Sequence, residues 1–235
     1  GYGEGQGLEI FSFSGKEPMK KLSTVKFPSF YQGYPDTWRV ELSGSKAVVA
    51  DEYNGFFVVD VADSSKAVTL MQGLAPKGKK IPEMAEPFSA AVAGNSVIYA
   101  AGYERGVYAF PCKGIEIAKS GAVNKLAIPS ADTAEIFAKE GESMRYRPDG
   151  QVRSVVPFGK DKAFVAAGNG GIHLLRIKPD FKVLAKFPTQ GIAVDLALKD
   201  NTLCVAEAGD GLSIWKVDAS GNIAECGRYL KPGAS

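Results

Sequence analysis

A turn that ends in glycine and leads directly into an alternating apolar segment occurs five times along this 235-residue chain. The glycines are Gly7, Gly55, Gly106, Gly171 and Gly211. Successive glycines lie 48, 51, 65 and 40 residues apart. Intervals near 40 to 50 residues are typical of propeller and solenoid architectures, in which one structural unit is repeated. This repetition constrains the fold more than any other feature of the sequence.

Each glycine-led segment belongs to a longer pattern of β-rich runs. In the fourth copy, runs at 152–156 and 163–166 precede the segment that follows Gly171, and a more polar run at 183–187 comes after it. Glycine, asparagine and aspartate at the joints between runs indicate tight hairpins. The repeating unit is therefore predicted to be four antiparallel strands, here lettered A to D in chain order.

Four-stranded units of this length, arranged radially, make a β-propeller. Strand A is small and apolar, which suits the central channel, whereas strand D carries Lys182, Lys186 and Arg228 and suits the rim. Lysines on an outer strand protect an exposed sheet edge from pairing with other chains. The sequence thus predicts an all-β fold, a β-propeller of four-stranded antiparallel blades. A β-helical solenoid is the alternative, but it needs shorter and more uniform repeats.

The second copy resembles a known repeat family. Residues 49–63 read VADEYNGFFVVDVAD and are similar to the LVIVD repeat, a propeller-type repeat with an Ala-Asp turn, a glycine and an apolar strand that ends in Asp-Val-Ser-Asp. The other copies keep the glycine and the strand but lose the closing aspartate. Proteins with such repeats are often secreted or surface proteins of bacteria and archaea. The resemblance therefore implies an extracytoplasmic location: secreted, periplasmic or on the cell surface.

We do not expect four and a half blades to complete a ring. We expect residues 1–235 to form one propeller domain with four full blades and a C-D half blade, because the first copy begins at strand C, 8–13, followed by strand D, 20–27. An open ring leaves two apolar faces in water. We favour N-terminal truncation of a larger ring. A partner chain segment that completes the ring and a five-blade ring with one truncated blade remain alternatives.

Binding residues are expected on the loops at one face of the propeller, where the D-A and B-C connections emerge. The longest D-A connection, 124–151, is predicted to be a loop insertion with a short helix over 132–139, because an N-cap serine and helix-forming residues occur there. An insertion that only decorates the surface is an equally good interpretation.

Alignment of the innermost strands, with two extra residues allowed in the hairpin 158–162, places four side chains at one level near the start of strand A. They are Arg39, Ser89, Arg153 and Asp195. Arginines at a channel mouth can donate paired hydrogen bonds to a small anionic or polar ligand. The alternative is that these arginines pair with Asp195 or with acids of the B-C turns, such as Asp51, Glu104 or Glu207, and only tie blades together.

Aromatic side chains cluster beside Arg39. Tyr31, Tyr34 and Trp38 are candidates for a platform that contacts a sugar or peptide, since such residues are enriched at interfaces. Packing between two blades is the competing explanation for the same residues.

Several classes of function find no support in the sequence. The 28 basic and 26 acidic residues nearly balance, which argues against a nucleic-acid partner, and no apolar run approaches the roughly 18 residues of a membrane span. The one histidine, His173, lies within an alternating strand without nearby ligands, so we predict no metal site, no cofactor and no catalytic triad.

The chain has three cysteines, Cys112, Cys204 and Cys226. Strand C separates Cys204 from Cys226 by roughly 9.5 Å, which is too far for a disulfide. No bond between Cys204 and Cys226 is therefore expected. A bond between them would refute the proposed strand order.

These observations favour a non-catalytic binding module that presents its D-A and B-C loops to a protein or glycan partner. A propeller hydrolase, lyase or lactonase-like enzyme, with arginines and carboxylates at the channel mouth, is the alternative, because fold alone does not determine function.

Overall fold

The computed structural model describes ten stretches of the chain: residues 7–27, 37–51, 55–74, 87–93, 96–101, 106–111, 124–127, 144–146, 148–177 and 182–230. Every regular element within them is a β-strand. The chain divides into two compact units. Unit 1 comprises Gly1–Ala90 and Gly114–Ala131, and unit 2 comprises Ala91–Lys113 and Asp132–Ser235. The two units are described separately below.

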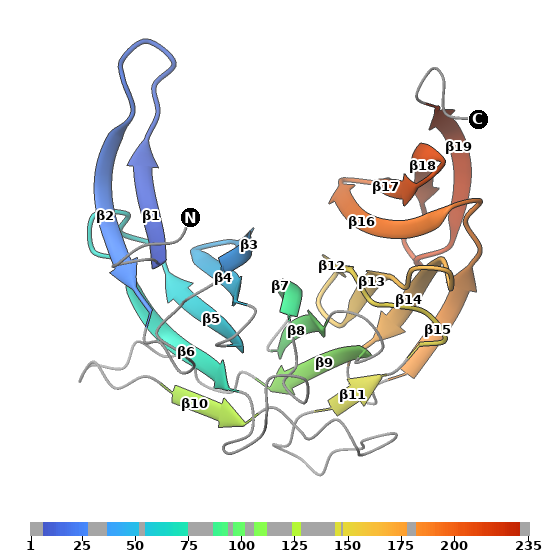
Figure 1. The fold of residues 1–235 in the computed structure, drawn as a ribbon, viewed down its shortest axis with the longest axis horizontal. Helices are drawn as coiled ribbons and strands as arrows, with labels where there is room; N and C mark the ends of the chain where they lie inside the picture. The colour runs from blue at the N-terminus through green and yellow to red at the C-terminus, as the bar shows by residue number, and fades with distance from the viewer. Residues whose placement is uncertain are drawn as a thin grey trace. The chain divides into compact units, whose positions relative to one another are not determined.

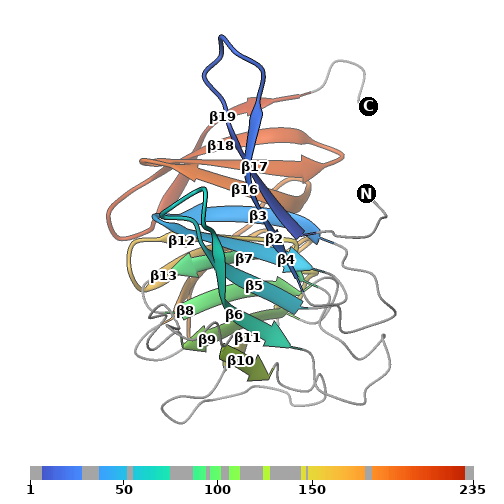
Figure 2. The same ribbon diagram turned by 90° about the vertical axis from the view of Figure 1, so that its left-hand side faces the viewer.

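Unit 1 contains two sheets (Figures 1 and 2). One is an antiparallel pair, and the other has the order β10-β6-β5-β4-β3, with β10 parallel to β6 and the rest antiparallel. Phe27 stacks on Phe57 with ring centroids 4.0 Å apart, which joins the two sheets of the unit. The strands are β1 (Gly7–Ser12), β2 (Lys20–Lys26), β3 (Thr37–Ser43), β4 (Lys46–Asp51), β5 (Gly55–Asp60), β6 (Val68–Leu74) and β10 (Asn124–Ala127).

The remaining strands make three four-stranded sheets, with orders β11-β9-β8-β7, β12-β13-β14-β15 and β16-β17-β18-β19. The strands of the first are β7 (Pro87–Ala93), β8 (Ser96–Ala101), β9 (Gly106–Pro111) and β11 (Met144–Tyr146). Those of the second are β12 (Ser154–Phe158), β13 (Lys162–Ala166), β14 (Ile172–Arg176) and β15 (Lys182–Phe187). Those of the third are β16 (Ile192–Lys199), β17 (Thr202–Ala208), β18 (Gly211–Val217) and β19 (Ile223–Tyr229).

The predicted all-β unit of four consecutive antiparallel strands is confirmed by the sheets β3–β6, β12–β15 and β16–β19. The pair β1–β2 occupies the place of the predicted C-D half blade. Cys204 and Cys226 are free and lie on β17 and β19, with β18 between them, as the strand order required. Cys226 is exposed, so it is not buried in the core.

The segment 124–151 differs from the predicted loop insertion. It contributes β10, which extends the sheet of β3–β6, and β11, which supplies the strand beside β9. Both strands are short, so neither shows the alternating pattern by which strands are recognised in a sequence. The predicted helix at 132–139 lies outside the described residues.

The repeated glycine has a specific structural role in the last two sheets. Gly171 and Gly211 have φ angles of +77° and +83°, a region that residues with a Cβ rarely occupy. A Cβ at Gly171 would overlap the carbonyl oxygen of Phe187, and one at Gly211 would overlap that of Tyr229. In both sheets the glycine therefore lets strand C begin against the end of strand D.

The core of unit 2 lies on both faces of the sheet β12–β15. One face packs with Ala91 and Val107, and the other packs with the sheet β16–β19 through residues such as Leu196 and Trp215. This explains why β13 and β14 are buried at almost every position, whereas β17 alternates between buried and half-exposed side chains. Two-sided burial removes the alternation that a sheet with one wet face retains.

Candidate functional site

A cleft of about 800 Å³ lies in unit 2 beside the sheets β12–β15 and β16–β19. The segment before β12, the β13–β14 turn, the start of β16 and the end of β17 all contribute to its wall. The lining residues are Pro148, Asp149, Gly150, Gln151, Arg153, Gly168, Asn169, Ile192, Val194 and Ala208. In these two sheets the D-A and B-C connections therefore share one face, as the predicted strand order requires.

Backbone hydrogen bonds hold the wall of the cleft. The N–H of Gly168 donates to the carbonyl of Ala193, and the N–H of Ala193 donates to the carbonyl of Gly168, each at 3.1 Å. The N–H of Leu196 also donates to Ser154 Oγ at 3.3 Å. These bonds join the β13–β14 turn and β12 to β16, so two neighbouring sheets are fixed where the cleft forms.

Arg153 is the predicted site residue that lines the cleft. Its Nη2 donates to Gln151 Oε1 at 2.8 Å, and its backbone N–H donates to the Ala166 carbonyl at 3.0 Å. At the rim, Lys186 Nζ lies 3.2 Å from Asp149 Oδ2, and both side chains are well exposed. The hydrogen bond with Asp149 is the main reason that the pKa of Lys186 is raised. The cleft thus carries a guanidinium, amides and an exposed ion pair.

The predicted alignment of side chains is correct at two positions and wrong at a third. Arg39 and Asp195 occupy matching places, each opposite an alanine of the neighbouring strand, but Ser154 rather than Arg153 takes that place in the sheet β12–β15. The alanines are Ala50, Ala166 and Ala206.

The error came from the length of one hairpin. The β12–β13 hairpin encloses 159–161, whereas the corresponding hairpins enclose 44–45 and 200–201, so it has one extra residue rather than two. A shift of one residue exchanges the faces of a strand. Arg153 therefore precedes β12 and reaches the cleft, while Ser154 is buried.

The other predicted site residues are not gathered at this cleft. Arg39 is in unit 1, where its Nε donates to Glu41 Oε1 at 2.6 Å. Trp38 is 57% exposed. Asp195 is half-buried, and its Oδ1 accepts the N–H of Leu196 at 2.8 Å. Ser89 lies on β7 with its side chain outside the described residues, and Tyr31 and Tyr34 lie outside them altogether.

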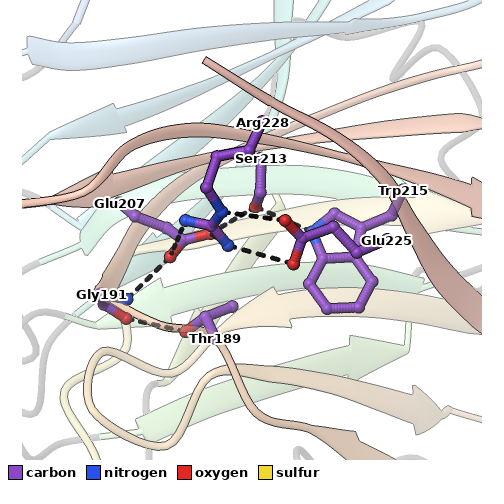
Figure 3. Close-up of polar contacts among 7 residues, drawn as sticks. All are labelled: Thr189, Gly191, Glu207, Ser213, Trp215, Glu225 and Arg228. Atoms are coloured by element: carbon purple, nitrogen blue, oxygen red, sulfur yellow. Dashed lines mark hydrogen bonds and ion pairs between the residues drawn. The ribbon is translucent and has the colours of Figure 1, made fainter. Parts of the chain in front are cut away.

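A buried polar network lies next to the cleft (Figure 3). The sequence suggested Glu207 as the partner of an arginine, but not that the arginine is Arg228. Glu207, on β17, accepts hydrogen bonds from the Gly191 N–H at 2.8 Å, from Arg228 at 3.1 and 3.2 Å, and from Ser213 Oγ. Trp215 Nε1 in turn donates to Ser213 Oγ at 2.8 Å. The carboxylate therefore ties the connection before β16 to three strands of the sheet.

Arg228 was expected on the rim of the blade, but its side chain is only 12% exposed and that of Glu207 is fully buried. The arginine also pairs with Glu225 at 2.9 Å. A strand-D arginine can turn inward because the buried carboxylate two strands away offers a bidentate partner. No short-range sequence pattern marks such a pair.

The pKa of Glu207 reflects this environment. Burial alone would raise its pKa, but hydrogen bonds from Arg228, Ser213 and Gly191 outweigh burial and hold the pKa below the ordinary value for glutamate. The hydrogen bonds that Arg228 donates to Glu225 and Glu207 raise its own pKa. Glu207 therefore stays ionised near neutral pH, which suits a structural tie better than a general acid.

His173 lies on β14 with 1% of its surface exposed. Its Nε2 is 3.1 Å from the Gly170 carbonyl, which can only accept, so the neutral ring carries its proton there. Its Nδ1 can then accept from the Tyr146 hydroxyl at 3.2 Å. Both ring nitrogens are used within the fold, which matches the view of His173 as a structural residue.

Unit 2 should lose stability as the pH falls below about 6.5. Burial, followed by the charge of Lys186, lowers the pKa of His173, so the unfolded chain binds a proton at a higher pH than the folded chain. The contribution of the neutral ring is complete above the ordinary pKa and is lost as the pH falls through the lowered one. His173 is the only histidine, so in urea titrations between pH 5 and 7.5 the variant His173→Gln should show a much flatter dependence. Equal slopes for the two proteins would contradict this assignment.

Two further properties concern the residues that the structure describes. Within these stretches, no three side chains of histidine, cysteine, aspartate or glutamate gather as a metal site. The same stretches hold no helix with the length and apolar character needed to cross a membrane.

Comparison with known proteins identifies the repeat. Residues 35–72 match the family model of the LVIVD repeat, and this segment runs from just before β3 into β6. This segment is similar to the LVIVD repeat. The match includes 49–63, the residues on which the resemblance was recognised. No curated protein sequence matches the chain.

Solved structures show the fold. A candidate 6-phosphogluconolactonase from Bacteroides uniformis is 12% identical with a TM-score of 0.60, and the match covers 95% of this chain and 64% of that chain. A protein of unknown function from Bacteroides caccae is 14% identical with a TM-score of 0.55, covering 92% of this chain and 76% of that chain. The chain thus has a β-propeller-type fold, and its four-stranded sheets are blades.

Proposed function

We propose that this LVIVD-repeat chain is a non-catalytic binding module of a secreted or cell-surface protein and that it presents its D-A and B-C loops to a protein or glycan partner. The observation that carries the proposal is the cleft of about 800 Å³ formed by those connections in two adjacent blades. Clefts of this size accommodate ligand groups that need both polar and apolar contacts.

The lining of the cleft suits recognition. Arg153, Gln151 and Asn169 offer guanidinium and amide groups that can bond to peptide groups or sugar hydroxyls. Ile192, which is 44% exposed, and Val194 supply an apolar wall. The proposed extracytoplasmic location is supported by the similarity to the LVIVD repeat, since such repeats often occur in secreted and surface proteins.

One observation favours a second candidate function. The similar structure from Bacteroides uniformis is named as a candidate 6-phosphogluconolactonase, and a phosphorylated lactone would meet Arg153 in this cleft. Four charged side chains beside Arg153 are nevertheless paired within the fold, since Lys186 pairs with Asp149 and Glu207 pairs with Arg228. Binding without catalysis therefore agrees better with the site.

The test is binding of the purified chain to a glycan array and to a displayed peptide library. We expect binding to one of these, weakened at least tenfold by Arg153→Ala and by Asn169→Ala because both residues line the cleft. Lys199→Ala, on the exposed β16–β17 hairpin, is the control and should bind normally.

Two outcomes would count against the proposal. Absence of binding to both libraries would contradict a protein or glycan partner at this cleft. Hydrolysis of 6-phosphogluconolactone faster than in buffer, reduced by Arg153→Ala, would replace the binding module with the enzyme.

A further inference from the structure

The last sheet carries an apolar face directed away from the sheet β12–β15. We define this outward face by residues from all four strands, on the side opposite the core residues Leu196, Val205 and Trp215. The outward face consists of Ala197, Cys204, Ala206, Leu212, Ile214, Gly227 and Tyr229. These residues are half-exposed or exposed, and Tyr229 is 63% exposed.

The register identifies what this face is built to contact. The cross-strand row Ala197, Cys204, Ile214 and Gly227 corresponds to the row Val156, Phe164, Leu174 and Ala185 of the preceding sheet. The row Ala206, Leu212 and Tyr229 corresponds to the row Ala166, Ile172 and Phe187.

In the preceding sheet, the residues at these positions pack against the next blade. Phe164, Ala166, Ile172 and Leu174 are at most 3% exposed because the sheet β16–β19 covers them. Every matching residue of the outward face is also nonpolar or aromatic. The outward face is therefore a blade-to-blade packing surface, and the partner that fits it is another sheet with the complementary side.

The complementary side appears at the other end of the chain. Phe11 on β1 is the fourth residue after Gly7, as Leu175 is after Gly171 and Trp215 is after Gly211. In all three strands a register shift comes immediately before this residue. Leu175 and Trp215 pack against the preceding sheet and are 1% and 7% exposed, whereas Phe11 is 46% exposed.

We propose that the outward face binds the β1–β2 sheet of a second copy of this chain, head to tail, with Phe11 of one copy packed on Ile214 and Leu212 of the other. The two surfaces are different, so the contact is heterologous. Each copy would contribute a different face of a blade to the interface. The sheets β12–β15 and β16–β19 of unit 2 contact each other in the same way.

The test is the mass of the full chain in solution, measured by light scattering after size-exclusion chromatography at tens of micromolar. We expect the wild type to run as a dimer or a larger assembly. Ile214→Glu and Phe11→Glu should each give monomers, since a charge would be buried without a partner. Ala219→Glu adds the same charge on an exposed turn and should leave the assembly intact.

Mixing the two monomeric variants separates this arrangement from others. The variant Ile214→Glu keeps its β1–β2 surface and Phe11→Glu keeps its outward face, so an equimolar mixture should recover dimers. Circular dichroism would confirm that both variants are folded. A monomeric wild type, an assembled Ile214→Glu variant or a mixture that stays monomeric would each overturn the proposal.

Discussion

Replacement of Arg228 by methionine is expected to destabilise the protein by about 3–5 kcal/mol, the usual cost of removing one partner of a buried ion pair. The carboxylate of Glu207 would then remain fully buried without the guanidinium that holds it ionised. The N–H of Gly191 and the hydroxyl of Ser213 donate to the same carboxylate, and they would lose an acceptor that Arg228 holds in place. The free energy of unfolding, measured in urea at pH 7, reports the effect.

Two comparisons make this result specific to the buried pair. Lys186→Met removes an exposed partner of Asp149 and should cost less than about 1 kcal/mol. Adding Glu207→Gln to Arg228→Met removes the buried charge and should recover part of the loss. If Arg228→Met proved as harmless as Lys186→Met, the network in Figure 3 would not be a structural tie.

The features predictable from the sequence are local ones. The glycine before strand C and the hairpins on either side of it lie close together in the chain. The order of the strands and their antiparallel pairing could therefore be predicted from the turn residues and from the alternation of apolar and polar residues. The LVIVD repeat was recognisable for the same reason, because its glycine and apolar strand are contiguous. For the candidate cleft, the sequence predicted only the face of the propeller on which it lies, the face formed by the D-A and B-C connections.

What could not be predicted depends on contacts between distant residues. The pairing of β10 with β6 is parallel and links segments far apart, and β11 is too short to carry a pattern. One extra residue in the β12–β13 hairpin moved Arg153 from the predicted level to the cleft. Arg228 looked like a rim residue, since only the folded sheet brings it to Glu207.

Replacement of Gly171 by alanine is expected to destabilise the chain by several kcal/mol. The φ angle of +77° alone costs an alanine roughly 1–2 kcal/mol. A Cβ there would also overlap the carbonyl oxygen of Phe187, so the end of β15 would have to move away from the start of β14. The unfolding free energy of Gly171→Ala in urea measures the sum of these effects.

We interpret the glycine-led segments as the third strands of blades, with Gly171 and Gly211 each against the end of the fourth strand. Gly159 has a φ of +67° but no atom within 4 Å of the place a Cβ would take, so Gly159→Ala carries the backbone cost without the overlap. The most direct measurement is the difference in unfolding free energy between Gly171→Ala and Gly159→Ala. We expect Gly171→Ala to be the less stable variant by at least about 2 kcal/mol, a typical cost of steric overpacking. Equal stabilities would contradict it.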